Sequence, residues 1–420
     1  MRSVILWCLG VVSVTAAVWS ADFPPPDRCP SRAEMPDPLE LLGGGRVQNR
    51  QEWEQHRRPE LKALFQHYMY GEYPARPHQV KGRVLFEDGQ FLEGRGILQE
   101  VELTFGPETW PKIYLLLALP KGRSPCPAFI GLNFGGNHLL TTHEKVRIPT
   151  VWMPSHYPGV VQNRATAEGR GKQVQVWPLE QILGRGYAVA TFYCGDIQPD
   201  RPHVREGMRA TLPERATETG RETATIMWWA WGIHNAVDYL LSEPRIDGRR
   251  LIVVGHSRLG KTALLAGAFD ERIALIIPHQ SGCGGAAPSR HQNPKAETVA
   301  RINATFPHWF CGNFKAFGAD VTRLPVDQNC LVALCAPRPV LLTNAQEDQW
   351  ANPEGQWEVL RAAAPAYQLY DVARPVIADK MPAVGTLSSE RLGYFIRPGQ
   401  HSMTPEDWKV FMDYSDRWLR

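Results

Sequence analysis

Short apolar runs recur along the chain and are separated by longer segments in which apolar residues return at helical spacing. Apolar runs between turn residues are typical of buried strands, whereas apolar residues three and four positions apart are typical of helices. The predicted strands are 113–119, 127–133, 188–193, 251–254, 273–277, 340–343 and 394–396. The predicted helices are 51–70, 179–185, 224–241 and 259–269.

Strands that alternate with helices favour a mainly parallel sheet with helices on both faces. Two connections, 135–178 and 195–220, are long and irregular. Loops of this length in a compact domain are usually functional, so we expect them to form the walls of an active-site cleft. No internal repeat or low-complexity linker divides the chain, and residues 22–420 are expected to form a single domain with an irregular, Pro-rich start.

The first 21 residues have the layout of a cleavable secretory signal. Arg2 precedes an apolar run from Val4 to Val18, and the small residues Ser20 and Ala21 follow. The run is shorter than the roughly 20 apolar residues of a membrane-spanning helix, which disfavours the alternative of a retained anchor. We expect residues 1–21 to be removed, and the mature protein to be secreted or periplasmic without membrane contact.

Composition and charge limit the classes of partner. The formal net charge is +3, and it becomes +2 when Arg2, the one charged residue of the signal, is removed. Neither nucleic acid nor an acidic membrane surface is therefore expected as a partner. Seven of the eight cysteines remain after Cys8 is removed, so at least one thiol is free and one to three disulfides are possible at most. The cysteines lack the spacing of a zinc site, and we expect no metal, no cofactor and a monomeric protein.

The residues around Ser257 predict a nucleophile elbow in an α/β-hydrolase fold. The strand 251–254 leads into the turn Gly255-His256-Ser257-Arg258, and a helix follows. Such a turn lifts the serine hydroxyl to the carboxyl edge of the sheet and aims the next backbone N–H at a developing oxyanion. In the usual pattern G-x-S-x-G the second glycine would stand at position 259, whereas this chain has Leu259 there and Gly260 next. The alternative is a serine that only caps the helix.

Arg258 and Lys261 lie in the first turn of this helix. Cations there oppose the helix dipole at a cost of roughly 0.3–1 kcal/mol each, so the stability of the helix does not explain their presence. We expect oxygen-rich or anionic groups to meet both side chains. Arg258 then stabilises the tetrahedral oxyanion and Lys261 binds substrate oxygens, whereas the alternative is an exposed basic face.

The predicted general base is His401. It follows the strand 394–396 and a Pro-Gly-Gln turn, and it precedes a helix start in which Thr404 is the N-cap and Pro405 the first helical residue. A histidine in this loop can reach the carboxyl edge of the sheet.

The acid that orients the base is expected directly after the strand 340–343, because hydrolases of this fold carry their acid between Ser and His in the sequence. A carboxylate there can hold the imidazole tautomer and stabilise the imidazolium. Asp348 is our first choice and Glu347 the second.

Several segments together match the motifs of one family. They are Gly255-His256-Ser257-Arg258-Leu259-Gly260-Lys261, 266–278, Ser281-Gly282-Cys283-Gly284-Gly285-Ala286, Glu347-Asp348-Gln349-Trp350 and Pro398-Gly399-Gln400-His401. Through them the chain resembles the glucuronoyl esterases, carbohydrate esterase family fifteen, closely over about 245–415 and more loosely before. The Ser-Arg-x-Gly-Lys core is specific to this family among hydrolases.

The resemblance implies a secreted α/β-hydrolase-fold enzyme that cleaves the ester between 4-O-methyl-glucuronic acid branches of xylan and lignin alcohols, without metal or cofactor. Glucuronoxylan and lignin–carbohydrate esters are thus the implied partners. The implied nucleophile, oxyanion stabiliser, base and uronate contact are Ser257, Arg258, His401 and Lys261. Trp350 and Glu297 are implied to contact the sugar. Their alternatives are a buried core Trp and a helix-surface Glu.

The chain departs from the fungal members of the family at two places. Gln280 stands where the fungal enzymes carry their catalytic Glu, so the acid is expected in the Glu-Asp-x-Trp loop, as in bacterial members. His256 and Ser402 stand where fungal members have two bridged cysteines, so that disulfide is absent.

Two other functions compete with this interpretation. An acetyl xylan or feruloyl esterase would share the fold, but neutral acyl groups do not require the pair Arg258 and Lys261. A catalytically inactive carbohydrate-binding protein would use some of the 14 tryptophans. Trp228, Trp229 and Trp231 lie on one predicted helix and are expected in the core.

Overall fold

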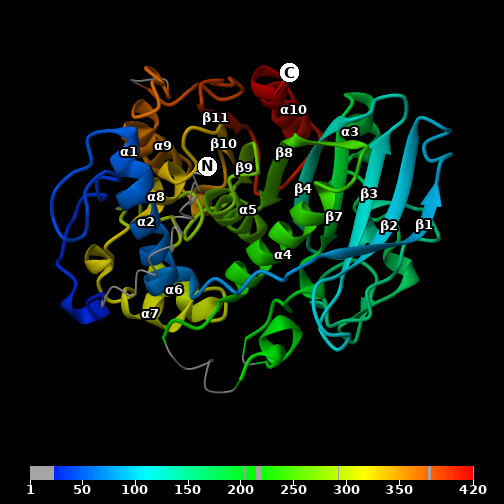
Figure 1. Ribbon diagram of the computed structural model, residues 1–420, viewed down its shortest axis with the longest axis horizontal. Coiled ribbons are helices and arrows are strands. Elements are labelled where there is room, and N and C mark those ends of the chain that lie inside the picture. The colour runs from blue at the N-terminus through cyan, green and yellow to red at the C-terminus, as the bar shows by residue number, and fades with distance from the viewer. Residues whose placement is uncertain (1–22, 203, 214–219, 292, 377–379, 420) are drawn as a thin grey trace, which may run out of the picture.

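A nine-stranded sheet forms the centre of the computed structural model, with the strand order β1-β2-β3-β7-β4-β8-β9-β10-β11 (Figure 1). The structure describes residues 23–202, 204–213, 220–291, 293–376 and 380–419, and the predicted signal at 1–21 lies outside them. The strands are β1 (Lys81–Asp88), β2 (Gly96–Thr104), β3 (Ile113–Pro120), β4 (Cys126–Asn133), β7 (Ala188–Tyr193), β8 (Ile246–His256), β9 (Leu275–His279), β10 (Val340–Ala345) and β11 (Leu392–Arg397).

The six strands from β7 to β11 pair in parallel, and β1, β2, β3 and β7 pair antiparallel. Each of the seven predicted strands overlaps an observed one. The prediction of a mainly parallel sheet between helices is therefore confirmed. The antiparallel pair β1 and β2 was not predicted.

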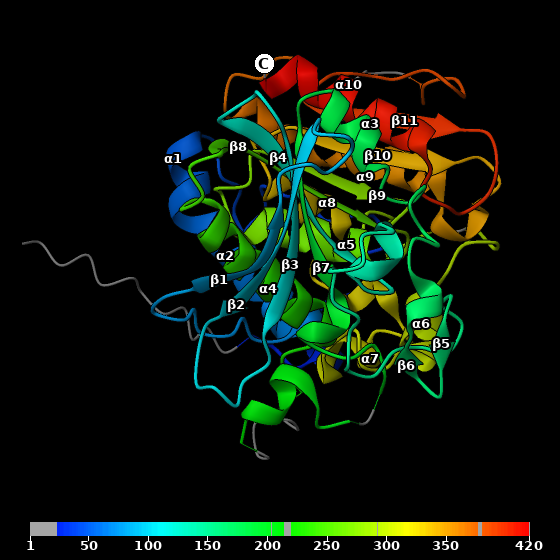
Figure 2. The same cartoon turned by 90° about the vertical axis from the view of Figure 1, so that its right-hand side faces the viewer.

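Alternate residues of the buried strands feed two hydrophobic cores, one on each face of the sheet. In β8, Leu251 and Val253 join one core, and Ile252 and Val254 join the other. The first core is covered by α4 (Thr225–Leu240), α5 (Arg258–Phe269), α8 (Gln328–Ala333) and α9 (Pro353–Gln368). The second is covered by α3 (Leu179–Gly184) and α10 (Pro405–Leu419), and the two layers can be followed in Figures 1 and 2.

The helix predicted at 51–70 is a continuous helical stretch, in which α1 (Arg50–Glu52) and α2 (Arg58–Phe65) are each followed by a π-helical turn. Two short helices, α6 (Val299–Thr305) and α7 (Gly312–Ala316), complete the first face. The three tryptophans Trp228, Trp229 and Trp231 of α4 are at most 2% exposed, as expected for core residues.

The two long connections both leave the carboxyl edge of the sheet, after β4 and after β7. The first contains a small hairpin of β5 (Val160–Val161) and β6 (Arg164–Ala165), and the second contains short 3-10 turns. These connections therefore lie over the end of the sheet at which β8 delivers Ser257.

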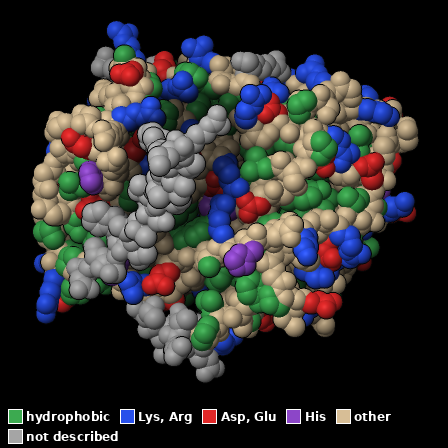
Figure 3. All heavy atoms as spheres, in the orientation of Figure 1, with side chains coloured by type: hydrophobic (Ala, Val, Ile, Leu, Met, Phe, Trp, Pro, Cys, Tyr) green, Lys and Arg blue, Asp and Glu red, His purple; other side chains and the backbone are tan. Residues whose placement is uncertain are grey.

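The seven cysteines from Cys29 to Cys335 are all buried, and each has a free thiol. Lys and Arg side chains are interspersed with Asp and Glu over the face drawn in Figure 3, in keeping with the small net charge. Within the described part of the chain, no helix is both long enough and apolar enough to cross a membrane.

Candidate active site

Ser257 lies in a sharp turn between β8 and α5 and has a left-handed backbone conformation, with φ 57° and ψ −126°. Such a conformation is strained for any residue with a side chain and persists only when the surroundings hold it. The Ser257 amide donates to the carbonyl of His279 at 3.0 Å, and the Ser257 carbonyl accepts from the amides of Gly260 and Lys261. The Ser257 hydroxyl makes no cap hydrogen bond to the helix, which argues against the helix-cap alternative.

Two glycines make this turn possible. A Cβ atom on Gly255 would lie 2.1 Å from the carbonyl oxygen of Leu259, and one on Gly260 would lie 2.8 Å from that of His279. Leu259 itself packs into the core and is 1% exposed. The close backbone approach thus falls at position 260, which explains why the second glycine is displaced from the usual pattern.

His401 and Asp348 meet because their loops leave neighbouring parallel strands. Strands β10 and β11 run in register to the pair Ala345 and Arg397, and the Glu347 amide then donates to the Gly399 carbonyl at 3.0 Å. The His401 Nδ1 and Asp348 Oδ2 atoms are 2.6 Å apart. Asp348 is 6% exposed, whereas Glu347 is exposed to solvent. Of the two candidate acids, Asp348 is the one in contact with the imidazole.

The guanidinium of Arg258 is held by residues of the two long connections. Its Nε lies 2.6 Å from Asp200 Oδ2, and it donates to the Tyr157 hydroxyl at 3.0 Å. Asp200 also accepts from His308 at 2.8 Å and from the Trp309 indole at 2.7 Å. Burial favours the neutral form of Asp200, but these hydrogen bonds and the guanidinium outweigh it, so its pKa lies below the ordinary value.

Asp200 and Tyr157 were not predicted from the sequence. The only sequence signal for them was their place in the two connections expected to wall the cleft. The anionic group that meets Arg258 is, in this structure, a carboxylate of the protein itself.

Lys261 is buried and donates to the carbonyl oxygens of Ser281 at 2.6 Å and Cys283 at 2.5 Å. An ammonium group has three donors, so one remains for another acceptor. Burial lowers the pKa of Lys261, and the charge of Glu297 opposes that shift.

Glu297 and Trp350 are neighbours in the structure, and the charge of Glu297 acts on Lys261. Glu297 is 5% exposed, and burial raises its pKa against the pull of Lys261. Its amide donates to the Trp350 carbonyl at 3.1 Å, while the Trp350 side chain is 43% exposed. Glu297 is thus buried and Trp350 exposed, whereas the alternatives were a Glu on the surface and a Trp in the core.

Gln280 links the residue before Ser257 to the residue after His401. Its Oε1 lies 3.1 Å from His256 Nε2 and 2.9 Å from the Ser402 amide nitrogen, which donates to it. The Gln280 amide donates to the Thr343 carbonyl of β10 at 2.9 Å. Burial and the adjacent His279 and His401 hold the pKa of His256 well below its ordinary value, so this ring is a neutral donor.

The rings of His256 and His401 pack with centroids 4.4 Å apart. The His256–Gln280–Ser402 link therefore joins the turn that contains Ser257 to the loop that contains His401. It spans the two positions at which the fungal enzymes are expected to carry their disulfide, and here the connection is non-covalent.

Within the described part of the chain, no three His, Cys, Asp or Glu side chains are arranged to hold a metal ion.

Comparison with known proteins identifies relatives along nearly the whole chain. The family model described as glucuronyl esterase, fungi, matches residues 181–371. Carbohydrate esterase MZ0003, from an unknown prokaryotic organism, is 37% identical over 97% of both chains. The solved structure of a promiscuous CE15 esterase from a marine bacterial metagenome is 37% identical, covers 94% of this chain and 99% of its own, and superposes with a TM-score of 0.86. A glucuronoyl esterase from Solibacter usitatus is 32% identical, with 94% and 100% covered and a TM-score of 0.84.

Replacement of Gln280 by Leu tests the link between His256 and Ser402. The substitution leaves two donors without an acceptor, and we expect the free energy of unfolding to fall by about 1–3 kcal/mol in urea denaturation. Gln280→Glu retains an oxygen acceptor and should lose less. If Gln280 also positions His401, kcat for ester hydrolysis should fall in Gln280→Leu while KM changes little, and Gln280→Glu should recover part of it. Equal stability and equal kcat in all three proteins would show that the link is dispensable.

Proposed function

Because this chain belongs to the glucuronoyl esterases of carbohydrate esterase family 15, we propose that it hydrolyses esters of 4-O-methyl-glucuronic acid, including those between xylan branches and lignin alcohols. The observation that carries the proposal is a strained serine elbow next to a His–Asp pair, with two cations in the first turn of the following helix.

In the proposed reaction, Ser257 attacks the ester carbonyl while His401 takes the hydroxyl proton. Asp348 accepts the Nδ1 proton of His401 in a hydrogen bond, which leaves Nε2 free as the base and stabilises the imidazolium. The alcohol leaves with the proton from His401 and a glucuronoyl-enzyme ester remains. Water, activated by His401, then hydrolyses this ester and restores Ser257.

The charge on the tetrahedral oxygen is assigned to the backbone amide and guanidinium of Arg258. Asp200 and Tyr157 fix that guanidinium before substrate arrives, so little reorganisation is needed in the transition state. Lys261 is assigned to the uronate oxygens with its remaining donor. Glu297 and Trp350 are assigned to the sugar, Glu297 through its carboxyl group and Trp350 through its exposed indole face.

We also propose that residues 1–21 direct export, and that the enzyme acts outside the cytoplasm. This agrees with a polymeric plant cell-wall substrate, which cannot enter a cell.

The substrate class is tested by comparing three esters. We expect a higher kcat/KM for benzyl glucuronate than for acetylated xylan or a methyl ferulate ester, because Arg258 and Lys261 suit an oxygen-rich uronate acyl group. Rates measured with the purified protein under one condition decide the question. Faster deacetylation of xylan would assign the chain to the competing acetyl esterase class.

The assignment of the acid is tested by two isosteric substitutions. Asp348→Asn should leave the fold intact and lower kcat by about 10⁴-fold, since the amide favours the wrong imidazole tautomer and cannot stabilise the imidazolium. Glu347→Gln is the matched control and should retain most activity, because this side chain is exposed to solvent. The reverse pattern would move the acid to Glu347, and two active variants would place it elsewhere.

The role of Arg258 is tested by steady-state kinetics. Arg258→Ala should lower kcat by about 10²-fold or more and change KM less, because its interaction develops in the transition state. Asp200→Asn keeps the guanidinium but weakens its anchor, so a smaller loss is expected. The exposed Arg249 provides a control in Arg249→Ala. A rise in KM alone for Arg258→Ala would make it a substrate-binding residue.

A further inference from the structure

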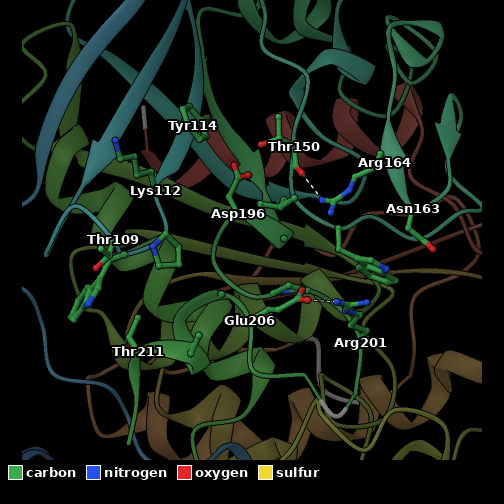
Figure 4. A pocket seen from close by; sticks show the side chains of 18 of the residues that line it. Thr109, Lys112, Tyr114, Thr150, Asn163, Arg164, Asp196, Arg201, Glu206 and Thr211 are labelled. Atoms are coloured by element: carbon green, nitrogen blue, oxygen red, sulfur yellow. Dashed lines mark hydrogen bonds and ion pairs between the residues drawn. The ribbon is translucent and has the colours of Figure 1, made fainter.

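A cavity of about 1100 Å³ lies beside the candidate active site, and none of the residues assigned to catalysis lines it. Its walls are the loop before β3, the parts 147–152 and 162–164 of the first long connection, and the parts 195–201 and 206–211 of the second. In Figure 4, Thr109 and Lys112 lie on one side, Asn163 and Arg164 on the other, and Asp196 between them. The volume slightly exceeds the usual range for ligand sites, about 300–1,000 Å³, and accommodates more than one sugar ring.

The cavity shares a wall with the active site. Asp200 binds Arg258, and the residues on either side of it, Pro199 and Arg201, line the cavity. Trp152, also in the lining, accepts a hydrogen bond from Tyr193, the last residue of β7, at 2.9 Å. A long ligand in the cavity would therefore lie next to the ester-cleaving residues.

The lining carries four cations, and two of them have no ion-pair partner within the described part of the chain. Lys112 pairs with Glu102 at 3.4 Å, and Arg201 pairs with Glu206. Arg147 and Arg164 instead donate to Thr150, to its hydroxyl at 3.0 Å and its carbonyl at 2.6 Å, respectively. Among the described residues, neither of these guanidinium groups has a carboxylate at ion-pair distance. Each has five donors, so most remain available to a ligand.

Asp196 is the buried carboxyl group in the middle of the lining. It is 6% exposed, and burial raises its pKa to about 8, against the opposing effect of Arg147. At pH 7 its neutral form predominates, so it neutralises Arg147 little and can donate a hydrogen bond to a hydroxyl oxygen. The cavity thus keeps a net positive charge.

Aromatic side chains also line the cavity, and two of them pack against its arginines. The guanidinium of Arg147 lies 3.8 Å from the ring centroid of Tyr114, and that of Arg201 lies 4.9 Å from the ring centroid of Trp152. Aromatic rings that combine an apolar face with nearby donors suit ligands that are apolar on one side and hydrated on the other. Sugar rings have this character, and a carboxylate matches the fork of an unpaired arginine.

We propose that this cavity is a second carbohydrate site, which binds a uronate-bearing segment of the polysaccharide whose ester is cleaved at Ser257. The inference rests on the proposed function for the identity of the polysaccharide. An uncharged aryl polymer fits less well, because it would desolvate Arg147 and Arg164 without offering either of them an anionic partner. A uronate supplies that partner.

Calorimetric titration of the full-length mature Ser257→Ala protein tests the proposal. The probe is a xylo-oligosaccharide with two glucuronate branches, compared with unbranched xylo-oligosaccharide and a lignin-type aryl-ether dimer. We expect the branched acid to bind most tightly, and Arg147→Gln or Arg164→Gln to raise its Kd about tenfold each, the loss of one charge-assisted contact. Arg164→Lys, which keeps the charge, should lose less.

Arg249→Gln is the matched control. Arg249 is exposed near the start of β8, at the opposite end of the strand from Ser257, so its substitution should leave Kd unchanged. Thermal unfolding verifies that each variant is folded. An unchanged Kd in both Arg147→Gln and Arg164→Gln, or tighter binding of the dimer or the neutral oligosaccharide, overturns the proposal. Hydrolysis of benzyl glucuronate by the unaltered enzyme is measured separately, so failure of the second site and failure of the proposed function are distinguished.

Discussion

The backbone at Ser257 is the constraint on which the arrangement of the site depends. A non-glycine residue in this conformation costs on the order of 1–3 kcal/mol, and its surroundings must supply that energy. Here β8 and α5 are both buried, and glycines at 255 and 260 let the two chain segments approach within the turn. The core of the sheet thus holds Ser257 in place, and the remaining residues of the site are arranged around one fixed hydroxyl group.

Parallel strands explain why residues distant in the sequence converge there. Strands β8, β9, β10 and β11 end at the same edge, and they are followed in turn by Ser257, Gln280, Asp348 and His401. Each of these residues needs only a short loop to reach the others. The two long connections add a second layer, since they hold Arg258 from the outside and form the cavity next to it.

The parallel part of this fold could be predicted from the sequence because its strands are continuous apolar runs. Strand β1 escaped prediction because it is an exposed edge strand, and β2 because it carries Glu100 and Glu102 within a buried run. The partners of those carboxylates lie on other segments of the chain. Glu102 pairs with Arg83 and Lys112, and Glu100 accepts from Asn137 and from the Arg147 amide. Likewise, Asp200 contacts Arg258, more than 50 residues away in the sequence, and Gln280 contacts His256, more than 20 residues away. Hydrophobic periodicity does not reveal such contacts. The choice between Asp348 and Glu347 depended on which of the two side chains points toward His401. The conformation of the loop determines this, and the sequence pattern does not reveal it.

The seven buried thiols bear on how such an enzyme is made. Burial raises the pKa of every one of them, so the reactive thiolate is suppressed and none is poised for oxidation or exchange. An exported protein commonly depends on an oxidising compartment and on an isomerase to reach its native pairing. Among its described residues, this chain has no disulfide pairing to reach. A reducing cytosol and an oxidising periplasm should yield the same molecule.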